Sequence, residues 1–286
     1  MKIGCHLSIA KGLEAAAKNA VRLEAEGFQF FTKNPRGFRS KTINYTDAEK
    51  GVALMRRHNL ATIAHSPYIT NLSTPKPDLQ DLTVRSLVED LTICDAFGTP
   101  GLVVHCGKHV EMGESYGLDR MVETLNLILD AYDGPCQILL ENTAGQGSEV
   151  GTTLEQLVET RNRTNGPERI GFCFDTCHGF AAGLWNGDLL GSFLKAGRDT
   201  GYLESLRAIH LNDSKGPFGN HRDRHEFIGK GNIGEEALAA FLRSPELQHL
   251  PVFLETPVED ENAYGAEMAY VRRLAGKDGD ALEGRA

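Results

Sequence analysis

The sequence predicts a single α/β domain of the (β/α)8 class, the TIM barrel, with its active site at the carboxyl ends of the strands. Eight short apolar runs recur along 286 residues. Their mean spacing of about 36 residues suits one strand, one helix and two short loops. The segments between the runs are rich in strong helix formers, so strand and helix alternate along the chain. An open, doubly wound sheet is the alternative architecture.

The apolar runs are predicted to be strands because they are brief and rich in β-branched and aromatic residues. They begin near residues 2, 28, 61, 101, 137, 170, 207 and 251. Helices are expected at 13–25, 49–58 after a cap at Thr46 and Asp47, 79–97, 118–132, 154–163 after Thr152 and Thr153, 187–198, 235–243 and 260–275. Residues 1–276 would then form the barrel domain, with 277–286 as a loosely ordered C-terminal tail.

Composition places the chain among ordinary globular proteins, with 41% hydrophobic and 24% charged residues. No apolar run approaches the roughly 18 residues that cross a bilayer. Six thinly spread cysteines form no CxxC pair, which predicts reduced thiols and a cytoplasmic location. The formal net charge of −9 argues against nonspecific nucleic-acid binding through a basic face.

An ionisable side chain stands at the end of every predicted strand. These residues are His6, Lys33, His65, His105, Glu141, Asp175, His210 and Glu255. One such residue alone is more often a hydrogen-bonding group than a ligand. A full ring of them would crowd one rim of the barrel, where the carboxylates would repel one another unless cations compensated them. The pattern therefore predicts a metal site.

Two loops add further ligand types. His178 follows the strand-end residue Asp175 by three positions, while Asp223 and His225 have the i, i+2 spacing that points both side chains the same way. The complete candidate set is His65, His105, Glu141, Asp175, His178, His210, Asp223, His225 and Glu255. This set exceeds the needs of one tetrahedral ion, so two or three ions are expected, with a carboxylate such as Glu141 bridging. Imidazoles mixed with carboxylates favour Zn²⁺, with Mn²⁺ in part of the sites or iron as alternatives.

Metal loading would change the electrostatics of this acidic chain. Three divalent ions would turn the carboxylates of the cluster from about −4 to about +2, and the whole chain from −9 to about −3. Such an electropositive pocket suits phosphate ester chemistry, because two ions can hold the attacking and leaving oxygens and one can lower the pKa of a bound water.

Six runs of the sequence carry a family resemblance: FTKNPR at 31–36, LLENTAG at 139–145, FDTCHGFAAG at 174–183, HLNDSKGPFG at 210–219, DRHEFIGKGNIG at 223–234 and LETP at 254–257. Through them the chain resembles endonuclease IV, the zinc-dependent apurinic/apyrimidinic endonuclease family of DNA repair, over nearly its whole length. The resemblance implies a monomer that uses three zinc ions. It would cut duplex DNA 5′ to abasic sites by metal-activated hydroxide, leaving a 3′-hydroxyl and a 5′-deoxyribose phosphate.

The resemblance also implies roles for individual residues. It sorts the ligands into one group for each ion: His65, His105 and Glu141; Glu141, Asp175, His210 and Glu255; and His178, Asp223 and His225. It assigns the chemistry itself to Glu141 and Glu255. The loops after the second and third strands would enter the minor groove and unstack a base step. Their DNA-contact residues would be Asn34, Arg36, Tyr68 and Ile69.

Two other interpretations remain for the same residues. Metal-dependent sugar isomerases and epimerases share this barrel type, but a carboxylate-dominated site for one or two Mg²⁺ or Mn²⁺ ions is typical of them. A noncatalytic damage-binding module would be favoured by a missing ligand, and none is missing. The loop after His105, with the sequence CGKHVEMGES, and His6 carry no assigned role.

Overall fold

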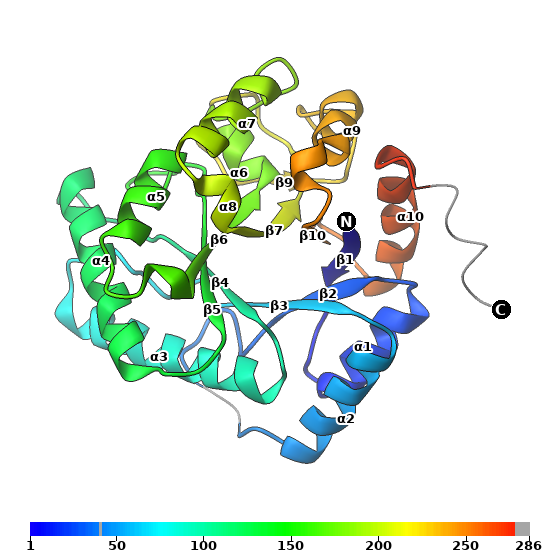
Figure 1. The fold of residues 1–286 in the computed structure, drawn as a ribbon, viewed down its shortest axis with the longest axis horizontal. Coiled ribbons are helices and arrows are strands. Elements are labelled where there is room, and N and C mark those ends of the chain that lie inside the picture. The colour runs from blue at the N-terminus through cyan, green and yellow to red at the C-terminus, as the bar shows by residue number, and fades with distance from the viewer. Residues whose placement is uncertain (40–41, 278–286) are drawn as a thin grey trace.

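The computed structural model describes residues 1–39 and 42–277. Within them, eight parallel strands close into a barrel in the order β1-β10-β7-β6-β5-β4-β3-β2 (Figure 1). The barrel strands are β1 (Lys2–His6), β2 (Gly27–Phe31), β3 (Ala61–His65), β4 (Gly101–His105), β5 (Gln137–Glu141), β6 (Ile170–Asp175), β7 (Leu206–Leu211) and β10 (Pro251–Leu254). The TIM-barrel prediction is confirmed, and the closed ring excludes the open-sheet alternative.

Helices alternate with the strands and surround the ring in Figure 1. Their bounds are α1 (Leu13–Arg22), α2 (Tyr45–Arg57), α3 (Pro77–Ala96), α4 (Glu114–Ala131), α5 (Leu154–Asn162), α6 (Thr176–Ala181), α7 (Leu190–Asp199), α8 (Tyr202–Ser205), α9 (Glu235–Arg243) and α10 (Tyr264–Leu274). In the part of the chain that the structure describes, no helix is both long and apolar enough to cross a bilayer. The predicted tail, 277–286, lies outside the described residues except for Lys277.

Helix starts depend on local caps, and one predicted cap is wrong. Helix α2 begins before Thr46, because the Asn44 side chain accepts a hydrogen bond from the Asp47 N–H. The cap predicted before α5 is present, since the Thr153 hydroxyl oxygen accepts from the Gln156 N–H. Short 3-10 turns precede β6, β10 and α10 at Pro167–Arg169, Pro245–Leu247 and Glu261–Ala263.

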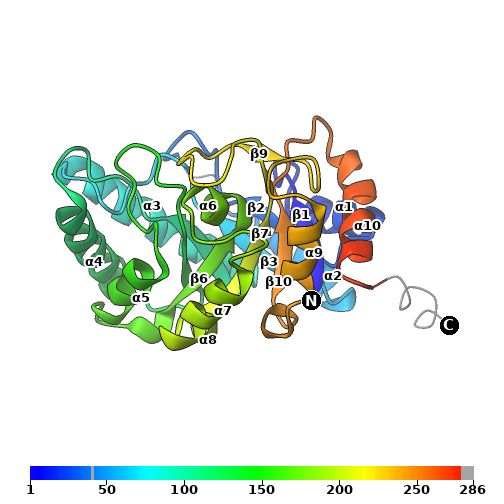
Figure 2. The same cartoon turned by 90° about the horizontal axis from the view of Figure 1, so that it is seen from above.

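Two features at the carboxyl rim of the barrel were not predicted. The short helix α6 follows β6 without a loop. The long connection from β7 to α9 contains an antiparallel pair, β8 (Asp213–Ser214) and β9 (His225–Glu226). Figure 2 shows this connection passing over the rim. The pair therefore holds the predicted ligand His225 close to the ends of the barrel strands.

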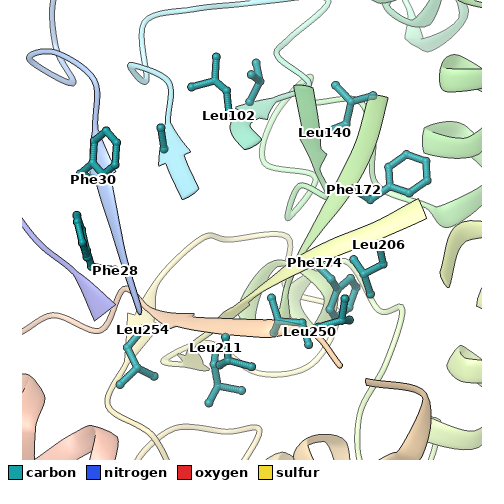
Figure 3. Close-up of a cluster of buried hydrophobic side chains, with 14 of the residues drawn as sticks. Phe28, Phe30, Leu102, Leu140, Phe172, Phe174, Leu206, Leu211, Leu250 and Leu254 are labelled. Carbon is teal, nitrogen blue, oxygen red and sulfur yellow. The ribbon is translucent and has the colours of Figure 1, made fainter. Parts of the chain in front are cut away.

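Alternate strand residues face opposite sides of the barrel wall, which gives two apolar layers. Outward-facing side chains pack between the wall and the helices, among them Phe28, Phe30, Leu102, Leu140, Phe172, Phe174, Leu211 and Leu254 (Figure 3). Inward-facing side chains form a separate buried cluster, which we call the interior layer: Ile63, Val103, Leu139, Cys173, Ala208 and Phe253. The interior layer fills the barrel beneath its carboxyl rim.

Candidate metal centre

The pleat of the strands directs six ligand candidates into the barrel. Each of them lies two residues after a member of the interior layer. Five are strand residues and therefore share its inward face, and Glu255 directly follows β10. The six are His65, His105, Glu141, Asp175, His210 and Glu255. Because the strands are parallel, their carboxyl ends meet at one rim. The six side chains consequently lie directly above the interior layer.

The prediction that Lys33 ends a strand at the barrel rim is wrong. Strand β2 ends at Phe31, so Lys33 lies beyond the sheet and is buried against α3. Its Nζ is 3.1 Å from Asp90 Oδ1 and 3.1 Å from Ser86 Oγ. A buried carboxylate on the neighbouring helix thus binds the ammonium group that the sequence pattern assigned to the rim.

Glu141 lies at the centre of the cluster and is fully buried. Its Oε2 is 3.4 Å from His65 Nε2 and 3.2 Å from His105 Nε2. Its Oε1 is 2.8 Å from His210 Nδ1 and 3.5 Å from His178 Nδ1. One carboxylate therefore faces four imidazoles, which is the position expected of a bridging residue.

The structure brings all nine candidates together in three adjoining groups. In each group the ligand atoms lie within 4.8 Å of one another: His65, His105 and Glu141; Glu141, Asp175, His210 and Glu255; and His178, Asp223 and His225. This division matches the one that the family resemblance implies. Glu141 joins the first group to the second. His225 Nε2, 3.6 Å from Asp175 Oδ2, brings the third group beside them.

Cys177 also lies within reach of the cluster, next to Asp175 and His225. Its side chain is buried, and its Sγ donates to the Arg224 carbonyl oxygen at 3.7 Å. Burial raises the pKa of the Cys177 thiol to about 12. Since the thiolate is the form that binds metals, the protonated thiol is a poor ligand, and packing remains the better interpretation of this residue.

Four of the five imidazoles donate one ring N–H to a neutral oxygen, which fixes the direction of the other nitrogen. The acceptors are the Ser66 carbonyl for His65 at 2.7 Å, the Asn142 carbonyl for His178 at 3.0 Å, the Glu255 carbonyl for His225 at 3.2 Å and the Gln29 side chain for His210. The second nitrogen of each ring then points at the carboxylates. Histidines that ligate metals are held in this way.

Two buried atoms in the centre lack a hydrogen-bond partner among the described residues, Glu141 Oε2 and His225 Nε2. The Nδ1–H groups of His65 and His225 are already used on carbonyl oxygens, so in the neutral rings each remaining nitrogen presents a lone pair to a carboxylate. Two lone pairs attract each other only through a shared cation. The donor set therefore fits divalent metal ions, and imidazoles mixed with carboxylates fit Zn²⁺.

The pKa shifts of the cluster also arise from carboxylates and imidazoles that are buried close together. Burial lowers the pKa of His225, but the carboxylates of Asp175 and Asp223 outweigh burial and raise it to about 9. Burial raises the pKa of Glu255, but His210 and His65 outweigh burial and hold it at about 2. Carboxylates crowded into a desolvated volume thus require compensating positive charge, which protons on imidazoles or metal cations can both supply.

Gln29 is a supporting residue that sequence analysis missed. It lies on β2, is fully buried and points into the barrel. Its amide nitrogen donates to Glu255 Oε1 at 2.5 Å and to His6 Nδ1 at 3.1 Å, while its oxygen accepts from His210. Burial lowers the pKa of His6 to about 4, so its ring is a neutral acceptor. His6 therefore orients Gln29, and Gln29 orients two ligands.

Two asparagines were missed for a similar reason. Asn142 exchanges hydrogen bonds with the Asp175 backbone, at 2.8 Å to its oxygen and 3.1 Å from its nitrogen. Asn212 donates to Asp175 Oδ2 at 2.7 Å and accepts from the Glu255 N–H at 3.1 Å. Each follows a ligand within two residues along the chain, but an amide side chain is not ionisable and so does not belong to the strand-end pattern.

The predicted DNA-contact residues lie on loops beside the centre. The Tyr68 side chain is 60% exposed, although its ring centroid is only 5.8 Å from that of His65. Its backbone N–H donates to the Pro35 carbonyl oxygen at 2.9 Å, which joins the two loops. Asn34 and Arg36 are exposed, and Ile69 is half-buried.

Known proteins share this barrel and a substantial part of this sequence. Residues 17–274 match the family model described as a xylose isomerase-like TIM barrel. A probable endonuclease 4 from Symbiobacterium thermophilum is 56% identical over 274 residues, which cover 96% of this chain and 99% of that protein. The chain belongs to the endonuclease IV family. A second such relative, from Akkermansia muciniphila, is 40% identical over 94% of this chain and 97% of its own length.

Solved structures agree with membership of the endonuclease IV family. Endonuclease IV from Thermus thermophilus has a TM-score of 0.85 and 31% identity, over 97% of this chain and 100% of that chain. A D-tagatose 3-epimerase-like protein has a TM-score of 0.71 and 19% identity, over 97% of this chain and 99% of that chain. The likeness to the epimerase shows the shared fold alone.

Proposed function

We propose that this member of the endonuclease IV family repairs DNA by hydrolysing the phosphodiester bond 5′ to abasic sites in duplex DNA. The products would be a 3′-hydroxyl and a 5′-deoxyribose phosphate. The observation that best supports this function is the set of adjoining ligand groups joined by Glu141. Their donor atoms suit three divalent ions, with zinc favoured, beside exposed loops that can contact DNA.

Bound ions would supply Lewis-acid charge for the attacking and leaving oxygens of the phosphodiester and lower the pKa of the attacking water. The side chains of the centre divide the remaining work according to their exposure. Glu141 is fully enclosed, so we assign it to fixing the spacing between two ligand groups. The Glu255 side chain is 14% exposed, so it can face the substrate and accept a proton from the attacking water. Gln29 holds Glu255 Oε1 in place.

Lesion recognition is assigned to the two loops joined by Tyr68 and Pro35. An abasic nucleotide has no base to pair or stack, so turning it out of the helix costs less than turning out an intact nucleotide. Tyr68 offers an exposed aromatic surface for the opened step, and Arg36 offers a cation for the phosphates. The loops can therefore select DNA that is easily opened.

Incubation with an abasic duplex, and separately with simple ketoses, tests the proposed function. We expect a nick 5′ to the abasic site, a 3′ end that a polymerase extends, and unchanged ketoses. The same duplex with an intact base is the control. Ketose epimerisation without nicking would identify a sugar epimerase. Tight binding of metal-loaded protein to the abasic duplex without nicking would identify a noncatalytic binding module.

Substitution of Arg36 or Tyr68 by Ala should weaken binding to the abasic duplex by about tenfold, since stacking contacts of this kind contribute roughly 1–3 kcal/mol. Equilibrium binding, metal content and hydrolysis of bis(p-nitrophenyl) phosphate would be measured together. Only binding to the abasic duplex should change. Hydrolysis of the small diester should not, because it needs no opening of a helix. Arg163→Ala, beside the end of α5, is the matched control for lost charge. An equal loss of duplex binding and of bis(p-nitrophenyl) phosphate hydrolysis would show that the loops serve the metal centre instead.

A further inference from the structure

A cavity of about 530 Å³ lies at the end of the barrel opposite to the metal centre. Residues from the amino ends of β3, β4, β5, β7 and β10 line it, together with the last turns of α2. Ile63 and Leu139 of the interior layer form part of its wall and belong to the apolar cluster beneath the metal centre. A cavity of this size accommodates a ligand as large as a mononucleotide.

The charge of this lower cavity differs from that of the protein as a whole. The chain carries 39 acidic and 30 basic residues. Among the described residues that line the cavity, however, none is acidic, whereas Arg56 and Arg207 both carry a guanidinium group. An acidic protein thus presents only positive side-chain charge in this cavity. That distribution favours an anionic ligand.

The Arg207 guanidinium is held in place by neutral acceptors. Its Nε donates to Gln137 Oε1 at 3.2 Å, and its Nη1 donates to the carbonyl oxygens of Glu204 at 2.8 Å and Leu206 at 3.1 Å. Gln137 is itself fixed, because its amide nitrogen donates to the Glu168 carbonyl oxygen at 2.8 Å. Within the described residues Nη2 has no acceptor. The group is therefore oriented without being neutralised.

The other cations near this cavity also lack a carboxylate partner in the described part of the chain. The Arg56 side chain forms neither a hydrogen bond nor an ion pair there. Lys2 Nζ donates only to Asn59, at 2.6 Å to its carbonyl oxygen and 2.9 Å to its Oδ1, and Asn59 lines the cavity. By contrast, Arg198 pairs with the Glu246 carboxylate at 2.6 Å. Arg56 and Arg207 are exposed residues, so an anion that enters from solvent can reach both guanidinium groups.

We propose that the lower cavity is a binding site for a small organic phosphate. Its apolar or aromatic body would pack against Ile63 and Leu139, and its phosphate would lie against the guanidinium groups of Arg56 and Arg207. Guanidinium forks match the oxygens of a phosphate in two parallel hydrogen bonds, which explains the use of arginine here. The site is separate from the proposed nuclease centre and does not depend on it.

Fluorescence titration of the metal-loaded full chain with 1-anilinonaphthalene-8-sulfonate tests this site, because the probe joins an anion to an aromatic body. We expect one site per chain and at least tenfold weaker binding by the Arg56→Ala/Arg207→Ala double variant. Val52→Phe, which narrows the cavity without changing charge, should also weaken binding. Arg198→Ala removes a guanidinium elsewhere and should not. Thermal unfolding of each variant checks that it is folded.

Competition then tests the class of ligand. Deoxyadenosine monophosphate should displace the probe at least tenfold more effectively than inorganic phosphate, because only the nucleotide fills the apolar part of the cavity. Equal displacement by inorganic phosphate would overturn the proposal, as would unchanged probe affinity in both the double variant and Val52→Phe. The variants should nick abasic DNA normally. Absence of nicking by the parent protein would contradict the proposed function without affecting the probe result.

Discussion

Replacing Glu141 with Gln is expected to lower turnover on abasic duplex by about three orders of magnitude or more. The substitution keeps the shape of the side chain but removes the charge that two ligand groups share, and the charge stabilisation lost with it amounts to several kcal/mol. Glu141→Ala should have the same effect. Nicking of end-labelled duplex and elemental analysis would be measured on the same preparation, and bound metal should fall together with activity.

Glu123→Gln provides the matched control for this substitution. Glu123 is an exposed residue in the middle of α4 that pairs with Arg120 at 2.7 Å and is not among the ligand candidates. Its loss should change neither metal content nor nicking. Near-normal turnover of Glu141→Gln with a full complement of metal would show that the assigned role of Glu141 is wrong.

Purified protein should contain close to three zinc ions per chain, one for each ligand group. Sites closed by three or more protein ligands bind tightly and contribute to folding, so brief chelation should leave activity intact. Prolonged chelation should abolish nicking and lower the unfolding temperature, and added Zn²⁺ should restore both. Elemental analysis that returned one ion or none per active chain would contradict the three-ion assignment.

The fold could be predicted from sequence because parallel barrel strands are buried on both faces. Such strands appear as short continuous apolar runs, and the helical segments between them indicate the crossover connections of parallel strands. The ligands could also be predicted, since six of the nine lie at the end of a barrel strand or one residue from it. Asp175, for example, directly follows the buried run IGFCF, and the structure places its side chain at the rim.

The positions of Lys33 and Gln29 could not be predicted from the strand-end pattern. An ionisable residue at the end of an apolar run predicts a rim position only where the residue lies on the inward face of the barrel wall. Gln29 lies on the inward face, two residues after Gly27, yet it is neither ionisable nor at a strand end. Lys33 has the same parity, but β2 stops at Phe31, and beyond the sheet parity no longer sets direction. Only the tertiary contact with Asp90 decides where Lys33 points.

The β8–β9 pair could not be predicted from the sequence, for another reason. Each partner contributes only two residues, so no alternation or apolar run can mark it in the sequence. Contacts with other parts of the chain hold it, such as the Gly231 and Ile233 N–H groups that donate to the Asp213 carboxylate. The i, i+2 spacing of Asp223 and His225 nevertheless indicated that both side chains point the same way.

The interior layer also acts as an electrical insulator. Its six apolar side chains leave no polarisable solvent directly beneath the rim, so charge held there is poorly screened from below. Walls and a floor of low dielectric concentrate the field through the one side that water can reach. In the proposed function, an approaching phosphate backbone would therefore meet the potential of the metal-loaded centre from a single direction. The barrel would then guide DNA towards the rim before any side chain touches it.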